Sequence, residues 1–289
     1  MEIKDLQIFQ KVVEYGSVSK AAKSLNYVQS YVTVRIQKLE EELQTELFHR
    51  SSRGMVLNSE GKTLLFYSQN IISMVDEMIK VVQDCDNPAG SLEIGTVETV
   101  NKLPSILSAY HKKYPKIDLS LITGVTEDLV DDVLNYKLDG AFVTGYYNHP
   151  QIIQYEVFEE ELVLISNYDK LPFEELKNKP LLVFKQGCSY RAKLEGWVRD
   201  EGEINAKIME FGTMETILGS VIAGLGITII PKSTISLLEA EGVVRIYEIP
   251  EKYSKITTVF IHRADTFLTN ALQKFIETIK NAPETARKL

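Results

Sequence analysis

Hydrophobic residues in the first 45 positions recur every three to four residues, the spacing of helices that each bury one face. This pattern predicts three helices, the first over residues 3–15 and the third from Val28 to Leu39. Asn26 and Tyr27 are compatible with a turn between the second and the third. The positions expected to face a shared core are Ile3, Leu6, Phe9, Val13, Ala21, Ala22, Leu25, Val28, Val32, Ile36 and Leu39.

The second and third predicted helices, with their tight turn, have the pattern of a helix-turn-helix. Ala21 and Ala22 are small enough to let two helices approach closely, and Ser17 can cap the second helix after Gly16 ends the first. The third helix has a polar face formed by Ser30, Tyr31, Thr33, Val34, Gln37 and Lys38, with Gln29 and Arg35 on its flanks. An ordinary helical hairpin in a core would explain the apolar spacing but not this second face.

Residues 17–39 carry four cations and no Asp or Glu, although the whole chain has a net charge of -8. The cations are Lys20, Lys23, Arg35 and Lys38. Because local positive patches decide whether a surface binds phosphates, this stretch predicts a face that enters DNA. Gln29 is suited to an adenine edge, Arg35 to guanine or phosphate, and Val34 to a thymine methyl group.

The helical pattern stops after Leu43, and Leu47 and Leu57 flank the polar, glycine-containing turn HRSSRGM. This arrangement predicts the two-stranded wing of a winged helix. Arg50 and Arg53 in the wing are expected to contact backbone phosphates or a minor groove. Solvated surface arginines would have the same sequence pattern.

A single long helix is predicted from Asn58 onward, over SEGKTLLFYSQNIISMVDEMIKVVQD. Two series recur on it at seven-residue intervals, namely Leu64, Ile71, Met78 and Cys85, and Ser68, Val75 and Val82. Such a seam needs a partner, and a two-fold dimer would place two DNA-reading helices in successive major grooves. The alternative is that this helix packs on its own domain. Cys85 is interpreted as a small core residue of the seam.

The stretch from Asp86 to Gly90 has turn chemistry and marks a domain boundary. Downstream, strands alternate with helices, which is the pattern of mainly parallel α/β sheets. The predicted strands are SLEIGTV, KIDLSLITG, LDGAFVTG, ELVLISN, KPLLVF, AKIMEF, GITIIP and TTVFIH. The predicted helices are LPSILSAYHKKY, TEDLVDDVLNYK, AKLEGWVRDEG, METILGSVIAG and a final FLTNALQKFIETIK. About 200 residues of this pattern fit two small α/β lobes.

The run from Phe9 to Leu64 resembles the amino-terminal domain of LysR-type transcriptional regulators, through GSVSKAAKSL, QSYVTVRIQKLEEEL and LFHRSSRGMVLNSEG. The matching positions are Phe9, Gly16, Ser17, Ala21, Ala22, Leu25, Gln29, Ile36, Leu39, Glu40, Leu47, Phe48, Arg50 and Gly61. The family usually has Pro-Ala after the recognition glutamine and Ser three positions further on. This chain has Ser30, Tyr31 and Thr33 instead, and Gln44 and Asn58 replace a usual Gly and Thr.

The resemblance continues more loosely through the rest of the chain and implies an effector domain similar to type 2 periplasmic binding proteins. The expected fold is α/β overall, with an N-terminal winged helix-turn-helix over 1–58, a linker and dimerisation helix with a hinge over 59–88, and a two-lobed effector-binding domain over 89–289. Lobe 1 would cover about 89–160 and 266–289 and lobe 2 about 161–265. The chain would cross between the lobes near Glu160 and Asp265.

Open α/β sheets bind ligands beyond the carboxyl ends of their strands, where helix amino termini present free N–H groups. Four segments fit this description, at residues 95–99, 123–126, 144–145 and 187–191, and one further helix begins near Thr213. The effector-binding residues expected here are Thr96, Glu98, Thr99, Thr126, Thr144, Cys188, Ser189, Arg191 and Thr213. Thr96, Thr99 and Thr126 could equally be helix N-caps.

Glu98 and Arg191 are the charged members of this set. They either bind a charged effector or pair with each other across the cleft, and Arg191 would suit a carboxylate through its planar fork. Exchange of their pair for ligand contacts would bias lobe closure. Cys188, beside Arg191, is also considered as a redox-sensing thiol, although no second cysteine lies near it in the sequence.

Composition excludes several other classes of protein. The 289 residues, 44% hydrophobic and 25% charged, are ordinary for a globular chain of two or three domains. Two cysteines and four scattered histidines give no disulfide framework or zinc cluster, so no cofactor or metal is expected. The start lacks a signal-peptide pattern, and no run approaches the roughly 18 apolar residues of a spanning helix. We therefore expect a cytoplasmic location without membrane contact.

The predicted function is that of a LysR-type regulator, which recognises an inverted-repeat promoter site and responds to a small-molecule effector bound between two α/β lobes. Its expected partners are double-stranded DNA, the effector and further copies of itself, as a dimer or a tetramer; RNA polymerase is considered as another. A solute-binding protein would explain residues 91–289 but not the DNA-reading helix. An α/β enzyme would explain the architecture, but the sequence has no nucleophile-elbow, paired-carboxylate or P-loop signature.

Overall fold

The structure is a computed structural model, which describes residues 1–51, 54–82, 90–100, 103–167, 173–176, 178–202, 207–266 and 268–281. The chain divides into two compact units, Met1–Gln83 with Asn135–Lys137, and Asp84–Leu134 with Leu138–Leu289. In the described ranges, one hydrophobic core lies in the first unit and two lie in the second. Among the described residues, no helix is long and apolar enough to cross a bilayer.

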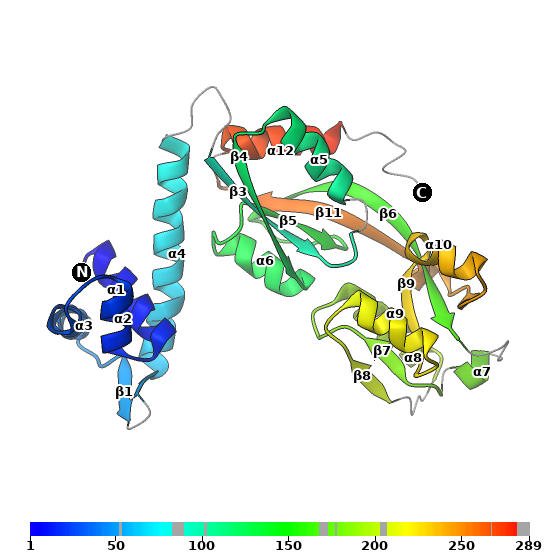
Figure 1. The fold of residues 1–289 in the computed structure, drawn as a ribbon, viewed down its shortest axis with the longest axis horizontal. Coiled ribbons are helices and arrows are strands. Elements are labelled where there is room, and N and C mark those ends of the chain that lie inside the picture. Colours follow the sequence, from blue (N-terminus) through cyan, green and yellow to red (C-terminus); the bar gives the residue numbers. More distant parts are fainter. Residues whose placement is uncertain are drawn as a thin grey trace. The chain divides into compact units, whose positions relative to one another are not determined.

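The first unit is a winged helix-turn-helix followed by a long helix (Figure 1). Its elements are α1 (Ile3–Tyr15), α2 (Val18–Ser24), α3 (Gln29–Leu43), β1 (Phe48–Ser51), β2 (Gly54–Leu57) and α4 (Ser59–Val82). The strands β1 and β2 pair antiparallel as the wing. The predicted three helices, turn and wing are thus confirmed.

Local backbone chemistry sets where these helices begin and end. Gly16 ends α1 in the left-handed conformation, with φ of 59°, which glycine adopts without steric cost. The Ser17 hydroxyl then caps α2 by accepting from the Lys20 N–H. Asn26, with φ of 57°, makes the turn before α3, as Asn tolerates this region better than most residues.

Two residues predicted to face the core of the first unit are exposed instead. Ile3 is 45% exposed and Val28 is 68% exposed, whereas Phe9 and Val32 are fully buried. Ile3 is the first residue of α1 and Val28 is the N-cap of α3. Both therefore lie at helix ends, where the spacing is kept but the neighbouring helix no longer covers the position.

The seam predicted on α4 is divided, because Ile71, Met78 and Val82 are exposed whereas Ser68 is not. Ser68 is fully buried and accepts a hydrogen bond from Gln10 of α1 at 3.2 Å, so its side of the helix packs on the unit itself. Exposed large apolar side chains form a stripe along α4, made of Tyr67, Ile71, Met74, Met78 and Val82. Phe66 and Ile79 of the same helix are exposed as well. Cys85 and the predicted break at 86–89 lie outside the described residues.

The first lobe of the second unit is built around one part of a sheet that has both parallel and antiparallel strands. Its elements are β3 (Gly90–Val97), α5 (Leu103–Lys113), β4 (Ile117–Gly124), α6 (Thr126–Leu134), β5 (Gly140–Thr144) and α12 (Asn270–Lys280). Strand β3 is parallel to both β4 and β5. Helices α5 and α12 cover one face of this sheet and α6 the other (Figure 1). The rings of Phe142, Phe260 and Phe275 meet in its core.

The second lobe is built from shorter elements around its own core. They are α7 (Phe173–Leu176), β7 (Leu181–Val183), α8 (Ser189–Asp200), β8 (Ile208–Glu210), α9 (Met214–Ile222), β9 (Thr228–Pro231), α10 (Lys232–Ala240), β10 (Arg245–Tyr247) and α11 (Glu251–Ser254). Strands β7 and β8 pair in parallel, and Trp197 and Leu182 are buried in the core of this lobe.

Two long antiparallel strands connect the lobes, β6 (Ile152–Ser166) and β11 (Lys255–Arg263). Strand β6 begins earlier than predicted, so the predicted strand ELVLISN forms only its second half. Beyond the lobe crossing, β6 pairs antiparallel with β9 and β10. The sheet is therefore more antiparallel than predicted.

The core packing shows where each strand crosses. Phe158 of β6 belongs to the first core and Leu162 to the second, so the chain crosses around Glu160. On β11, Ile256 lies in the second core and Val259 in the first. The return therefore comes earlier than the predicted Asp265, because β11 itself runs from one lobe into the other.

Candidate nucleic-acid interface and ligand cleft

The first turns of α3 present a neutral polar face to solvent. Ser30, Val34 and Gln37 follow each other at four- and three-residue steps and are exposed, opposite the buried Val32 and Ile36. Gln29, the first residue of the helix, is exposed as well, and Thr33 is half-buried and donates to the Gln29 carbonyl at 3.0 Å. These side chains can meet base edges in a groove.

Arg35 does not belong to this face, contrary to the sequence prediction. Its Nε–H donates to the carboxylate of Asp5, which is only 1% exposed, and its Nη2 donates to Glu2 at 2.8 Å. The hydrogen bond to Glu2, and after it the bond to Asp5, raises the pKa of the guanidinium. Burial acts in the opposite direction but is outweighed. Arg35 is therefore an internal ion-pair partner of α1, and its charge is neutralised.

Tyr31, also predicted to contact DNA, is half-buried against the core of the first unit. Its ring lies 5.1 Å from that of Tyr27 in an edge-to-face contact, and the Lys4 ammonium approaches both rings. Tyr31 thus anchors the start of α3 to α1.

The carboxyl-terminal end of α3 is acidic. Glu40 accepts from the Leu47 N–H at 2.9 Å, and Glu42 lies 3.9 Å from Lys38, while Glu41 is exposed. Glutamates repel phosphates, so only the amino-terminal turns of α3 can lie against a nucleic-acid backbone.

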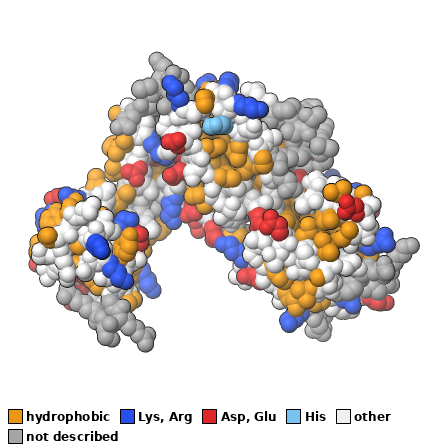
Figure 2. All heavy atoms as spheres, in the orientation of Figure 1, with side chains coloured by type: hydrophobic (Ala, Val, Ile, Leu, Met, Phe, Trp, Pro, Cys, Tyr) orange, Lys and Arg blue, Asp and Glu red, His pale blue; other side chains and the backbone are white. Residues whose placement is uncertain are grey.

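Exposed cations flank the neutral face. Lys20 and Lys23 of α2 and Lys38 of α3 are all exposed. The side chain of Arg50 and the whole of Arg53, both predicted to contact phosphates, lie outside the described part of the structure. On the visible face of the second unit, acidic and basic side chains are intermixed without a large patch of one sign (Figure 2).

A cavity of about 140 Å³ lies between the two lobes of the second unit. It is lined by Val97, Glu98, Thr99, Thr123, Gly124, Val125, Thr126 and Thr144 of the first lobe and by Phe184, Lys185, Cys188 and Gly212 of the second. A neighbouring hollow of about 390 Å³ shares Thr126, Thr144 and Cys188 and adds Ser189 and Arg191. The structure thus gathers seven of the nine predicted effector residues around one cleft.

The two remaining predictions are corrected. Thr96 is buried, and its hydroxyl donates to the Val97 carbonyl at 3.0 Å rather than facing the cavity. Thr213 caps α9 by accepting from the Thr216 N–H, and it does not line either hollow.

Hydroxyl groups lie along the floor of the cleft. The Thr126 and Thr144 hydroxyls are 3.2 Å apart, and the Thr144 N–H lies 3.4 Å from Thr126 Oγ1. From the opposite lobe, Ser189 donates to the Thr144 carbonyl at 2.9 Å. Both threonines are buried, so a ligand that displaces these bonds must supply equivalent partners.

Glu98 and Arg191 do not pair with each other. Arg191 donates to Glu195 and to Glu210 at 2.7 Å, both within its own lobe. Glu98 instead accepts from the Met214 N–H at the start of α9, at 2.9 Å across the cleft. The predicted Glu98–Arg191 switch is therefore wrong, because each charge has a different partner.

Lys185 is a cleft residue that the sequence reasoning missed. Its ammonium lies 2.7 Å from the Asp128 carboxylate and so bridges the lobes. Lys185 directly follows Phe184 at the end of the predicted strand KPLLVF. The rule that ligands bind beyond strand carboxyl ends could have found it.

Cys188 is half-buried, and burial raises the pKa of its thiol, which outweighs the lowering by the Arg191 and Tyr190 N–H groups. A thiol that is less ionised than usual is a poor redox sensor. Beside it, the hydroxyl of Tyr190 is buried near Thr99 and Glu160, and burial raises its pKa. In the described part of the chain, no three His, Cys, Asp or Glu residues lie together in a group that could hold a metal ion.

Comparison with known proteins decides the family. Residues 3–62 match the bacterial regulatory helix-turn-helix protein model of the lysR family, and residues 86–284 match the LysR substrate binding domain. The chain belongs to the LysR family. It is therefore a DNA-binding transcriptional regulator with a substrate-binding domain.

Curated relatives of this LysR-family chain are similar over nearly their whole length. The HTH-type transcriptional regulator CzcR of Bacillus cereus is 53% identical over 280 residues, which cover 97% of this chain and 97% of that protein. The regulator GltR of Bacillus subtilis (strain 168) is 43% identical over 286 residues, which cover 97% of each chain.

Solved structures of full-length LysR-family regulators share the fold. CbnR is 21% identical with a TM-score of 0.71, covering 97% of this chain and 98% of that chain. CbnR complexed with its target DNA also gives 0.71 at 21% identity, covering 98% and 100%. The expected combination of a helix-turn-helix domain and a two-lobed α/β domain is confirmed.

Proposed function

We propose that two copies of this LysR-family regulator place the first turns of α3 in successive major grooves of an inverted-repeat promoter site. The observation that carries the proposal is the exposed row of Ser30, Val34 and Gln37 opposite a fully buried face. A helix-turn-helix reads bases with the amino-terminal residues of its second helix, while the first helix crosses the backbone. Lys20 and Lys23 on α2 would contact phosphates there.

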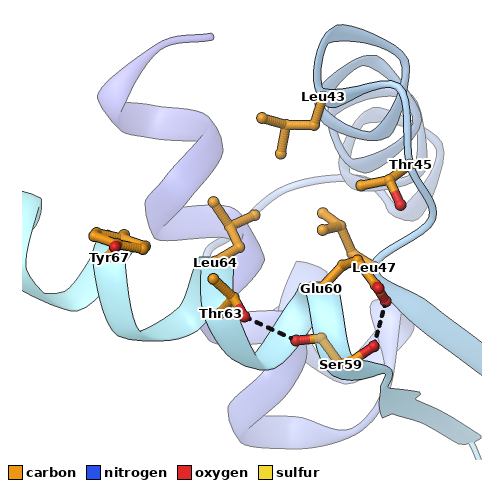
Figure 3. A pocket seen from close by; sticks show the side chains of 8 residues that line it. All are labelled: Leu43, Thr45, Leu47, Ser59, Glu60, Thr63, Leu64 and Tyr67. Carbon is orange, nitrogen blue, oxygen red and sulfur yellow. Dashed lines mark hydrogen bonds between the residues drawn. The ribbon is translucent and has the colours of Figure 1, made fainter.

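Dimerisation is supported by the apolar surface of α4. Its exposed stripe continues through Tyr67 into a hollow of about 330 Å³, lined by Leu43, Thr45, Leu47, Ser59, Glu60, Thr63, Leu64 and Tyr67 (Figure 3). Contiguous exposed apolar surface of this kind marks an interaction site. A second copy of α4 would cover it, and a dimer would link two half-sites, which bind far more tightly together than singly.

The second unit would bind a small-molecule effector in the cleft between its lobes. Thr99, Thr126 and Thr144 offer hydroxyls there, and bonds from Ser189, Lys185 and the Met214 N–H reach across from the other lobe. A ligand that replaces these cross-cleft bonds would change the equilibrium between open and closed lobes. RNA polymerase is a further partner that such a change could affect.

To test the DNA proposal, a duplex that the protein binds is selected from random sequences. Its affinity for the protein is then measured at about 50 and about 200 mM salt, because phosphate contacts weaken steeply between these concentrations. We expect Ser30→Ala and Gln37→Ala to weaken binding to the selected duplex. The control Leu237→Ala, an exposed apolar residue of the second unit, should not. Equal binding of wild type to unrelated DNA, or no effect of the two variants, would contradict the proposed face.

Oligomerisation and the cleft need separate tests. Met74→Glu should convert a dimer to monomers in sedimentation, because it places a charge on the exposed stripe of α4. For the cleft, a thermal-shift screen of amino acids, sugars and organic acids should find a compound that stabilises wild type but not Thr126→Val. If the compound stabilised Thr126→Val equally, its binding site would lie outside the cleft. In the sedimentation test, a monomeric wild type would exclude the dimer.

A further inference from the structure

We propose that Val34 reads the C5-methyl group of a thymine in each half-site. The inference rests on the proposed entry of α3 into the major groove. Val34 is 58% exposed, one turn after Ser30 and three residues before Gln37 in the middle of the outward row. It is the large apolar side chain at the centre of this row.

A single exposed valine is common on protein surfaces and would mean little alone. What distinguishes Val34 is its surroundings. Ser30, Thr33 and Gln37 around it are all neutral and can form hydrogen bonds, whereas apolar neighbours are on the buried side of the helix. The row therefore has one apolar side chain, Val34, with hydrogen-bonding side chains on either side of it.

The ion pair of Arg35 removes this arginine from guanine reading. Guanine is recognised in the major groove mainly by Arg or Lys, which donate to its two acceptors. Arg35 is held by Asp5 and Glu2, on the side of α3 that faces α1. Lys38 lies on the flank of the row, near Glu42 at 3.9 Å.

Thymine is the base that matches what remains. It alone presents a methyl group in the major groove, and an apolar side chain in contact with this methyl distinguishes it from cytosine. Glutamine can bond both edge atoms of an adenine, so Gln37 or Gln29 would read an A·T pair next to it. The half-site is thus expected to be rich in A·T pairs where α3 lies.

The acidic end of α3 fixes how the helix can lie in the groove. Glu41 is exposed one turn after Gln37, on the same side of the helix. Its charge keeps this end away from the phosphates, so the amino-terminal turns enter the groove and Val34 comes to the base edges rather than to the backbone.

The test replaces single thymines by deoxyuridine, which removes only the methyl group. In the duplex obtained by random-sequence selection, each thymine of a half-site is replaced in turn, and binding is measured by fluorescence anisotropy for wild type, Val34→Ala and Leu237→Ala. One replacement should weaken wild-type binding about fourfold, the effect of one buried methyl group. Leu237→Ala should show the same loss, and thymines outside the half-sites should show none.

Val34→Ala decides the assignment. This variant should bind the thymine duplex more weakly than wild type and show no further loss with deoxyuridine, because the partner of the methyl group is already gone. The inference is overturned when wild type binds every deoxyuridine duplex as tightly as the parent, or when Val34→Ala keeps the fourfold sensitivity. Since Val34 is exposed, its truncation leaves the core intact.

The two levels of the proposal fail in different ways. Loss of binding in Gln37→Ala without any deoxyuridine effect leaves the proposed interface in place and removes only the role of Val34. Unchanged binding in Ser30→Ala, Gln37→Ala and Val34→Ala removes the interface itself, and the inference with it.

Discussion

The guanidinium of Arg35 on α3 donates to the buried carboxylate of Asp5 on α1. The two residues are 30 positions apart, and Asp5 lies outside the positively charged stretch 17–39. The charge of that stretch is therefore lower at the surface than the sequence implies. The pair fixes the crossing of α1 and α3, so it orients the face that carries Val34.

Removal of either partner should destabilise the first unit. Asp5→Ala removes the buried partner of Arg35 and leaves it only the exposed carboxylate of Glu2. Loss of one hydrogen bond to a charged group costs about 2 kcal/mol. Hydrogen exchange of the α1 and α3 amides, followed against urea, measures this loss. Lys38→Ala is the matched control, since its exposed ion pair contributes little. A stability equal to that of wild type in Asp5→Ala would show that the pair is not an anchor.

Gly61, near the start of α4, has no room for a side chain. A Cβ at this position would lie 2.1 Å from the carbonyl oxygen of Leu47. Gly61→Ala should therefore displace the wing from α4 and destabilise the first unit by about 2 kcal/mol, as expected for overpacking. Gly219→Ala on α9 is the control, because it meets open space and alanine favours a helix there by about 1 kcal/mol. Chemical denaturation of both variants checks the opposite signs.

Glu98 should protect the Met214 amide at the start of α9 from hydrogen exchange. Its carboxylate accepts from the Met214 N–H across the cleft, so Glu98→Ala removes a hydrogen bond of about 1 kcal/mol. The Met214 amide should then exchange with solvent roughly five times faster by mass spectrometry or NMR. The Thr216 amide, which bonds to Thr213 instead, should keep its rate. Unaltered exchange at Met214 would mean that the lobes do not share this bond in solution.

Cys188 should react slowly with alkylating reagents at neutral pH. Burial raises the pKa of its thiol, so the reactive thiolate is scarcer than for an exposed cysteine and its fraction grows only as the pH rises above the usual value. Iodoacetamide labelling of a Cys85→Ser variant between about pH 7 and 10 should give a midpoint above about 8.5, the unperturbed value. A midpoint below this value would restore the redox-sensor hypothesis.

Much of the first unit could be predicted from the sequence. Gly16, Ser17 and Asn26 act through local backbone chemistry, and Phe9, Ala21 and Val32 act through spacing along a helix. These effects need no knowledge of distant residues. The errors at Ile3 and Val28 came from helix ends, where the period is kept but the packing partner is missing.

The location of the cleft could also be predicted from a local pattern, namely the positions of the carboxyl ends of the strands. Thr99 and Thr126 follow predicted strands and Thr144 ends one, and parallel strands bring such positions to one edge of a sheet. Cys188 follows a predicted strand of the other lobe. Lys185 obeys the same rule and was overlooked. The rule gives a neighbourhood but not the direction of each side chain, as the inward-turned hydroxyl of Thr96 shows.

The sequence by itself determined the helices, the wing, the alternation of strands and the edge of the sheets where a ligand can bind. Only the tertiary structure decided the pairing of the charges. Arg35 pairs with Asp5, Arg191 with Glu195 and Glu210, and Glu98 with the Met214 N–H. Periodicity acts along the chain and can be read from it, whereas electrostatic attraction depends on distance in space and so on which elements pack together.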